Sequence, residues 1–147
     1  ETDWSKNTIV TGLNKAIAYA FAGMGGLSYW AVGSGASIWD TSLPSPSVTD
    51  TQLVNEIGRK VIPASAFAFL DSEGRVSATP TNVLQITLTF GAGDCNGEWR
   101  EFAIYGGNAT STLGSGIMIN HKTHALLVKT DTIQVQRQIK FTFNNNN

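Results

Sequence analysis

Strict alternation of apolar and polar residues marks the most ordered part of this sequence. From residue 84 to residue 90 every second side chain is apolar, namely Leu84, Ile86, Leu88 and Phe90, which predicts a strand with one buried face. After a break rich in Gly and Asn the alternation resumes, with Phe102 and Ile104 on one face and Trp99, Glu101, Ala103 and Tyr105 on the other. Gly and Asn supply the positive φ angles of a tight reversal, so residues 82–107 are predicted to form an antiparallel hairpin.

The last part of the chain has the same alternation. Its apolar face consists of Ile133, Val135, Ile139, Phe141 and Phe143, which predicts a closing strand. Arg137 interrupts that face. A buried Arg needs a carboxylate or several carbonyl partners, so Arg137 marks either a contact with another chain or, as we favour, an internal pair with Glu98 or Glu101.

Two segments have helical features instead. Residues 7–21 carry apolar side chains at three- and four-residue spacing, which predicts an amphipathic helix ended by Gly23, Gly25 and Gly26. Thr49 and Gln52 have the spacing of a capping box, and Leu53 and Ile57 follow one turn apart. This pattern predicts a second, short helix that ends at Gly58.

Further strands are predicted at 27–32 and over the nearly continuous apolar run 59–70, which is expected to be buried on both sides. The fold class is therefore mostly β (α+β), an antiparallel β-sandwich-like domain with an amino-terminal amphipathic helix and a second short helix. Residues 1–143 are expected to form a single domain, and residues 144–147, all Asn, a flexible polar tail.

Composition narrows the classes of partner. Charged residues make up 14% of the 147 residues and the net charge is −1, so the chain lacks the basic face that nucleic acids or anionic membranes require. The single cysteine, Cys95, forms no internal disulfide, and the sequence shows neither a signal peptide nor an apolar run long enough for a membrane span. We expect a soluble protein made in a cytosol, with no nucleic-acid or membrane partner.

No residue pattern indicates an enzyme. His121 and His124 are three residues apart in a predicted turn, without a third ligand nearby in the sequence, so we expect no metal site. Cys95 has no neighbouring base to activate it, and the Gly clusters lack the Lys-Ser/Thr ending of a phosphate loop. We therefore expect no catalytic, cofactor-binding or metal-binding residues and no cofactor.

The four tryptophans, Trp4, Trp30, Trp39 and Trp99, allow two interpretations. Together they could form a stacking platform for carbohydrate. Large aromatic side chains also dominate protein cores and interfaces, and we favour this second role.

Several segments in order resemble the amino-terminal domain of tailed-bacteriophage tail or collar fibre proteins and related baseplate adaptor proteins. These are a helix with a Gly-rich end, a strand leading into Ala31–Gly35, a Pro/Ser loop, the segment Thr51–Glu56, the strand Glu98–Tyr105, and a last strand entered through Lys129–Asp131 and ending Ile139–Phe143.

The resemblance implies a non-enzymatic virion structural protein that attaches to the tail baseplate, collar or neck and mounts fibres. It implies other tail, baseplate, collar or fibre proteins as partners, a homo-oligomer such as a trimer or hexamer ring, and synthesis in the bacterial host cytoplasm. Because the sequence ends just after the last strand, an adaptor is favoured over a receptor-binding fibre. Trp30, Trp39 and Arg137 are the candidate interface residues. The alternatives are a carbohydrate-binding β-sandwich module and a capsid cement protein.

Overall fold

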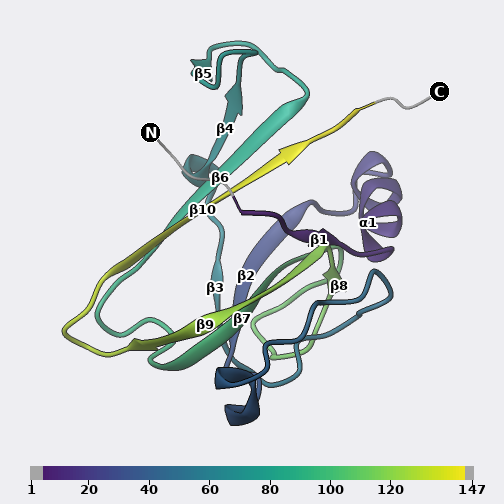
Figure 1. Cartoon of the computed structure of the whole chain (residues 1–147). Helices are drawn as coiled ribbons and strands as arrows, with labels where there is room; N and C mark the ends of the chain where they lie inside the picture. The colour runs from purple at the N-terminus through teal and green to yellow at the C-terminus, as the bar shows by residue number, and fades with distance from the viewer. Residues whose placement is uncertain (1–4, 145–147) are drawn as a thin grey trace.

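The computed structural model describes residues 5–144, which form two antiparallel β-sheets, one α-helix and two 3-10 helices (Figure 1). Trp4 and the last three residues of the predicted polar tail lie outside the described residues. The fold class predicted from the sequence, a mostly β, sandwich-like α+β fold, is confirmed.

The elements in chain order are β1 (Thr8–Ile9), α1 (Gly12–Phe21), β2 (Leu27–Gly33), η1 (Ser37–Asp40), β3 (Glu56–Val61), η2 (Ala64–Ala66), β4 (Phe67–Leu70), β5 (Val76–Ser77), β6 (Val83–Phe90), β7 (Gly97–Gly106), β8 (Ile117–Met118), β9 (Asn120–Lys129) and β10 (Val135–Thr142). Sheet 1 has the strand order β1-β9-β7-β2-β3, with β8 also paired to β7, and sheet 2 has the order β10-β6-β4-β5.

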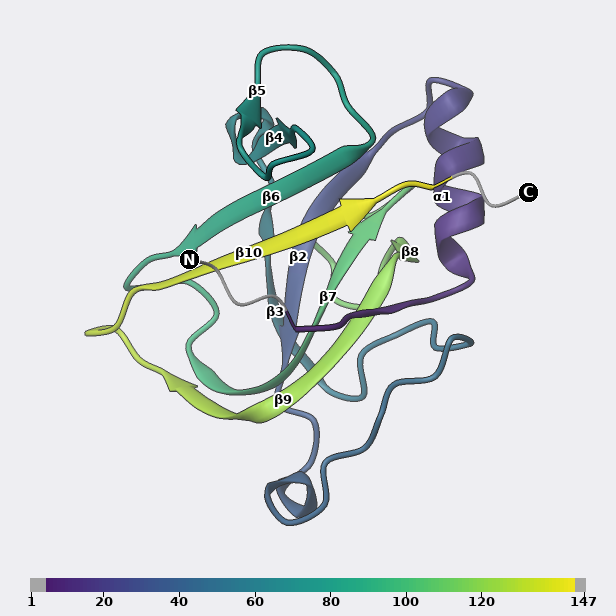
Figure 2. The same ribbon diagram turned by 45° about the horizontal axis from the view of Figure 1, so that its top comes forward.

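The main core lies between the two sheets, because β6 and β10 cross over β2 and β7 (Figure 2). Trp30 is at its centre, fully buried, with ring centroids 5.3 Å from Phe102 and 6.2 Å from Phe90. Ile86 and Ile139 are directly paired across β6 and β10 and face the same core. The alternation predicted for these two strands therefore supplies one complete wall of the core.

The predicted hairpin of residues 82–107 is wrong. Both strands form, but β6 pairs with β10 and β4, whereas β7 pairs with β2, β8 and β9. The turn between β6 and β7 carries the chain from one sheet to the other, so the two apolar faces meet across the core instead of lying side by side. Tight-turn residues permit a reversal but do not determine which sheet the next strand joins.

The pairing of β7 with β9 is irregular here and corrects a second expectation. Trp99 is opposite Leu127 and Glu101 is opposite Thr123, so the register shifts between them, with the additional residues on β9. Trp99 lies in the main core, with its ring centroid 5.0 Å from that of Phe90, and not on the face of Glu101.

The predicted second helix at residues 49–58 is wrong in its position. Residues 49–55 form no helix, β3 begins at Glu56, and the short helical turns lie at η1 and η2. The amide of Leu53 donates a hydrogen bond to the hydroxyl of Tyr105 at 3.1 Å. Backbone groups that a helix would pair internally are thus bound by side chains of the sheet.

The run predicted as one strand over 59–70 is two strands in different sheets. The chain leaves β3 in sheet 1, passes Pro63 and η2, and enters β4 in sheet 2. Proline interrupts a ladder because it has no amide hydrogen to donate.

The amino-terminal helix is shorter than predicted. Residues 8–9 pair with β9 as β1, and α1 begins at Gly12. A Cβ at Gly12 would overlap the carbonyl oxygen of Met118, so glycine lets the helix start directly against β8.

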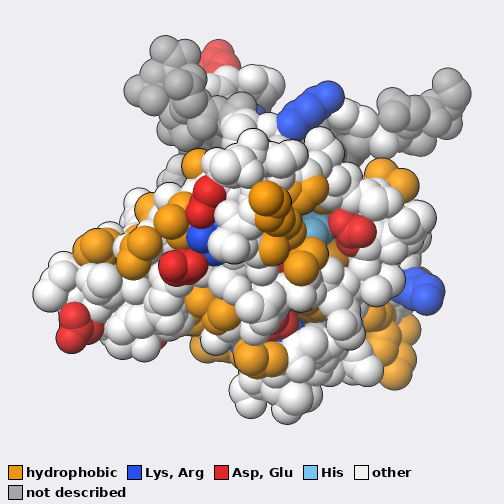
Figure 3. Space-filling view, turned by 60° about the horizontal axis from the view of Figure 1, so that its bottom comes forward, with side chains coloured by type: hydrophobic (Ala, Val, Ile, Leu, Met, Phe, Trp, Pro, Cys, Tyr) orange, Lys and Arg blue, Asp and Glu red, His pale blue; other side chains and the backbone are white. Residues whose placement is uncertain are grey.

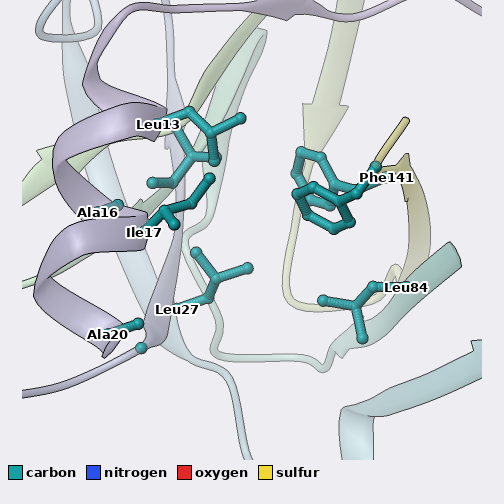
Figure 4. A pocket seen from close by; sticks show the side chains of 10 residues that line it. Leu13, Ala16, Ile17, Ala20, Leu27, Leu84 and Phe141 are labelled. Carbon is teal, nitrogen blue, oxygen red and sulfur yellow. The ribbon is translucent and has the colours of Figure 1, made fainter. Parts of the chain in front are cut away.

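Leu13 and Ile17 of α1 face Leu84 and Phe141 of sheet 2 across an apolar cavity of about 160 Å³ (Figure 4).

Candidate functional site

The outer face of sheet 1, which points away from sheet 2, carries most of the buried charge of the described chain. The long connection of residues 34–55 covers this face. Its apolar part is a second core in which Ala31, Ala103 and Tyr105 of the sheet pack with Leu53. Figure 3 shows this side of the molecule, where apolar side chains gather next to acidic ones and a histidine.

Glu101 is the centre of this layer and is completely buried. One carboxylate oxygen accepts the amide of Val54 at 3.0 Å and lies 2.8 Å from His121 Nε2, and the other accepts the amide of Asn55 at 2.8 Å. Gly33 is the residue directly opposite Glu101 on β2. The absence of a side chain there lets the carboxylate cross β2 and reach the connection.

His121 connects Glu101 to Asp50, whose carboxylate lies 2.8 Å from His121 Nδ1. Burial lowers the pKa of His121, but its bonds to Glu101 and Asp50 outweigh burial and raise it above the usual 6.5. Burial raises the pKa of Glu101, but hydrogen bonds from His121, Asn55 and Val54 outweigh it and hold that pKa below its usual range. The result is an imidazolium between two carboxylates, with both ring nitrogens engaged.

Arg100, adjacent to Glu101, holds the other end of the connection. Its guanidinium donates to both carboxylate oxygens of Asp40, at 2.8 and 2.9 Å, and to the carbonyl of Ser34 at 3.0 Å. Glu98 is a third partner at 2.9 Å. The hydrogen bond to Arg100 lowers the pKa of Asp40, so Asp40 is an ionised acceptor.

Two further buried cations hold the remaining loops. Arg59 is paired with Glu56 and donates to the carbonyls of Thr110 and Ser115, which fixes the loop before β8. Lys129 donates to the carbonyl of Gly91 at 2.6 Å, in the turn between β6 and β7. Each of these charged groups binds backbone of this chain, as buried charges must when no water can reach them.

The candidate interface residues lie in three different environments. Trp30 has no exposed surface, so its assignment to an interface is corrected: it is a core residue. Trp39 is half-buried in η1 and lines a surface cavity with Leu43 and Leu126. The structure does not bring these two tryptophans together.

Arg137 is half-buried, with its guanidinium carbon 5.8 Å from the ring centroids of both Trp99 and Phe102. The internal pair with Glu98 or Glu101 is not formed, because those carboxylates are bound by Arg100 and His121. Burial lowers the pKa of Arg137. Cation–π contact with the two rings takes the place of the expected ion pair.

The sequence predicted both histidines in a turn, but both lie inside β9. His121 belongs to the Glu101 cluster. The ring centroid of His124 lies 6.1 Å from that of Phe102, and burial lowers the pKa of His124. Within residues 5–144 no three His, Cys, Asp or Glu side chains are grouped as a metal ion would require.

Cys95 is half-buried in its turn, and burial raises its pKa to about 11, so its thiol stays protonated at neutral pH.

Sequence reasoning missed Glu101, His121 and Asp50 as one cluster. The signal for it was the pair Arg100–Glu101 inside an aromatic strand, because charged residues in a buried strand require partners from another segment. Nothing local to Asp50 indicates that it is this partner, since 71 residues separate Asp50 from His121.

Comparison of the sequence with protein-family models found no match, and a search of curated proteins found none either. None of the helices in the described part of the chain has the length and apolar character needed to cross a membrane.

Proposed function

We propose that this chain is a non-enzymatic structural component of a tailed-bacteriophage virion that attaches to the tail baseplate, collar or neck and assembles as a homo-oligomeric ring or trimer. The proposal rests on the resemblance in the sequence and on one structural observation, the open edge of β9. β1 pairs with this edge at Asn120 and His121, and no other strand of the described chain continues the pairing.

The open edge carries apolar side chains. Leu126 is 41% exposed and Val128 is 49% exposed. Unpaired edges that also expose apolar residues are hazardous for a monomer, and proteins that remain monomeric usually cover or charge them. An edge of this kind suits a protein whose neighbours in an assembly cover it.

The buried charged groups support a structural role in a second way. Glu101, Arg100, Arg59 and Lys129 are all bound to loop backbone of this chain. Their contacts make the connections rigid, and rigid loops are suited to repeated contacts in a symmetric particle.

The test is the position of the protein on purified phage particles that carry its gene, determined by cryo-electron microscopy with the chain built into density. Density at the tail, collar or baseplate is the expected result. Density on the capsid face would contradict this placement and favour a cement protein, and absence from every particle would overturn the virion role.

A matched pair of variants tests the contribution of the edge. Val128→Lys places a charge on the open edge, and Val48→Lys places the same charge on the 34–55 connection, where Val48 is 56% exposed. We expect both variants to fold, but only Val128→Lys to be lost from particles. Equal incorporation of both would show that the β9 edge is not the contact.

A further inference from the structure

The cavity beside Trp39 has the size and lining of a small-molecule site. It has a volume of about 400 Å³ and is lined by Trp39, Asp40, Thr41, Leu43, Ala125 and Leu126. Sites for small ligands usually have volumes of roughly 300–1,000 Å³ and combine apolar walls with a few fixed polar groups. Here the apolar walls come from two separate segments, η1 with its following loop and β9.

The indole of Trp39 is held in place by the backbone beneath it. A Cβ at Gly35 would overlap three carbons of the ring, so the ring lies directly on this glycine. Gly35 also has a φ of +57°, a conformation that favours glycine. The indole is therefore a preformed flat wall that needs little ordering when a ligand packs on it.

Asp40 provides the polar group next to this wall. Arg100 donates one hydrogen bond to each carboxylate oxygen, and an ionised carboxylate has about four acceptor positions. The side chain of Asp40 is 41% exposed, whereas that of Arg100 is 4% exposed. The carboxylate is thus held rigidly from inside and keeps acceptor positions that face solvent.

We infer that this cavity binds a neutral pyranose ring of a saccharide, with the apolar C–H face of the sugar on Trp39 and its hydroxyl groups donating to Asp40. A pyranose matches both features because it combines a flat C–H face with hydroxyl donors at its edge. Glu98, whose side chain is 54% exposed, adds a second negative charge next to Arg100. Acidic sugars are therefore disfavoured relative to neutral ones.

The inference concerns the isolated protein and is tested on it, separately from the proposed virion role, in which a neighbour at the β9 edge would cover Leu126. It also differs from a platform of several tryptophans, because Trp30 and Trp99 are buried in the main core. Trp39 alone of the tryptophans in the described chain lines this cavity.

The experiment is a glycan array, followed by titration of the purified protein with the best neutral glycan and with an acidic analogue of it. Trp39→Ala is expected to weaken binding at least tenfold, and Asp40→Asn by a smaller factor, with the melting temperature measured for each. Phe21→Ala is the matched control, because Phe21 is an 88% exposed aromatic residue on α1, outside the cavity lining. It should leave binding unchanged.

Leu126→Arg is the second test variant and replaces Trp39→Ala if that variant does not fold. It fills the cavity from the exposed edge of β9 without altering the ring or the glycine below it, and it should abolish binding. The inference is overturned if no neutral saccharide binds at millimolar concentration, if the acidic analogue binds more tightly, or if binding persists unchanged in the folded Trp39→Ala or Leu126→Arg variant.

Discussion

The two faces of sheet 1 are covered by different material and held by different interactions. The inner face meets sheet 2 through aromatic and branched side chains around Trp30. The outer face meets an irregular connection, where Glu101, His121 and Arg100 bind backbone groups and the side chains of Asp40 and Asp50.

This difference shows that one strand can serve two layers of opposite chemistry. Strand β7 contributes Phe102 and Ile104 to the apolar core, and it contributes Arg100 and Glu101 to the charged layer. The inner layer is stabilised by apolar area removed from water. The outer layer depends on complete pairing of charged groups, because each buried charge left without a partner destabilises the fold strongly.

The largest effect is expected from truncation in the inner layer. Trp30→Ala removes a fully buried side chain and should lower the free energy of unfolding by about 3–5 kcal/mol. Urea denaturation measures this change. Phe21→Ala, at an 88% exposed position, is the control and should change stability by less than about 0.5 kcal/mol. A similar loss in both variants would mean that Trp30 is not central to the core.

A smaller effect is expected from a wedge between sheet 1 and its outer cover. In Gly33→Ala the added Cβ would lie 2.6 Å from a Glu101 carboxylate oxygen and 2.7 Å from the carbonyl oxygen of Asn55. Such overpacking should cost about 1–3 kcal/mol. Gly26→Ala is the matched control, because a Cβ there meets nothing within 4 Å. If the two variants melt at the same temperature, the contact between Glu101 and Gly33 is looser than described.

The smallest effect is a pH dependence specific to the outer layer. The pKa of His121 is raised in the folded state above the 6.5 of an unperturbed histidine. The stability that protonated His121 contributes through its carboxylate partners is therefore complete below pH 6.5. It is lost as pH rises through the folded-state pKa of His121. The difference in melting temperature between the wild-type protein and His121→Gln should shrink across this range, whereas a constant difference would contradict a charged His121.

The inner layer was largely predictable from the sequence, and the outer layer was not. Alternation in β6 and β10 identifies the core residues directly, because period-two patterning reports which face of a strand is buried. The partner of each strand is set by long-range packing, which is why the turn of Gly and Asn residues after Phe90 suggested a hairpin where the chain changes sheets.

The outer layer escaped prediction because local signals there compete with distant ones. Thr49 and Gln52 have the spacing of a capping box, yet the amides of Val54 and Asn55 bind Glu101, more than 40 residues away in the chain. Charge-assisted hydrogen bonds of this kind are stronger than neutral ones and override a weak helical preference. The sequence identified Trp39 as a candidate interface residue, but it did not indicate that Ala125 and Leu126 of β9 line the same cavity.

The most direct test of the charged outer layer is amide hydrogen exchange in Glu101→Gln and in the wild-type protein. Hydrogen bonds to charged groups contribute about 1.5–3 kcal/mol each, so the amides of Val54 and Asn55 should lose protection by roughly ten- to a hundredfold. Amides in β6 and β10 should keep theirs. Unchanged exchange at Val54 and Asn55, or an equal loss of protection throughout the protein, would contradict the conclusion that Glu101 holds the 34–55 connection on sheet 1.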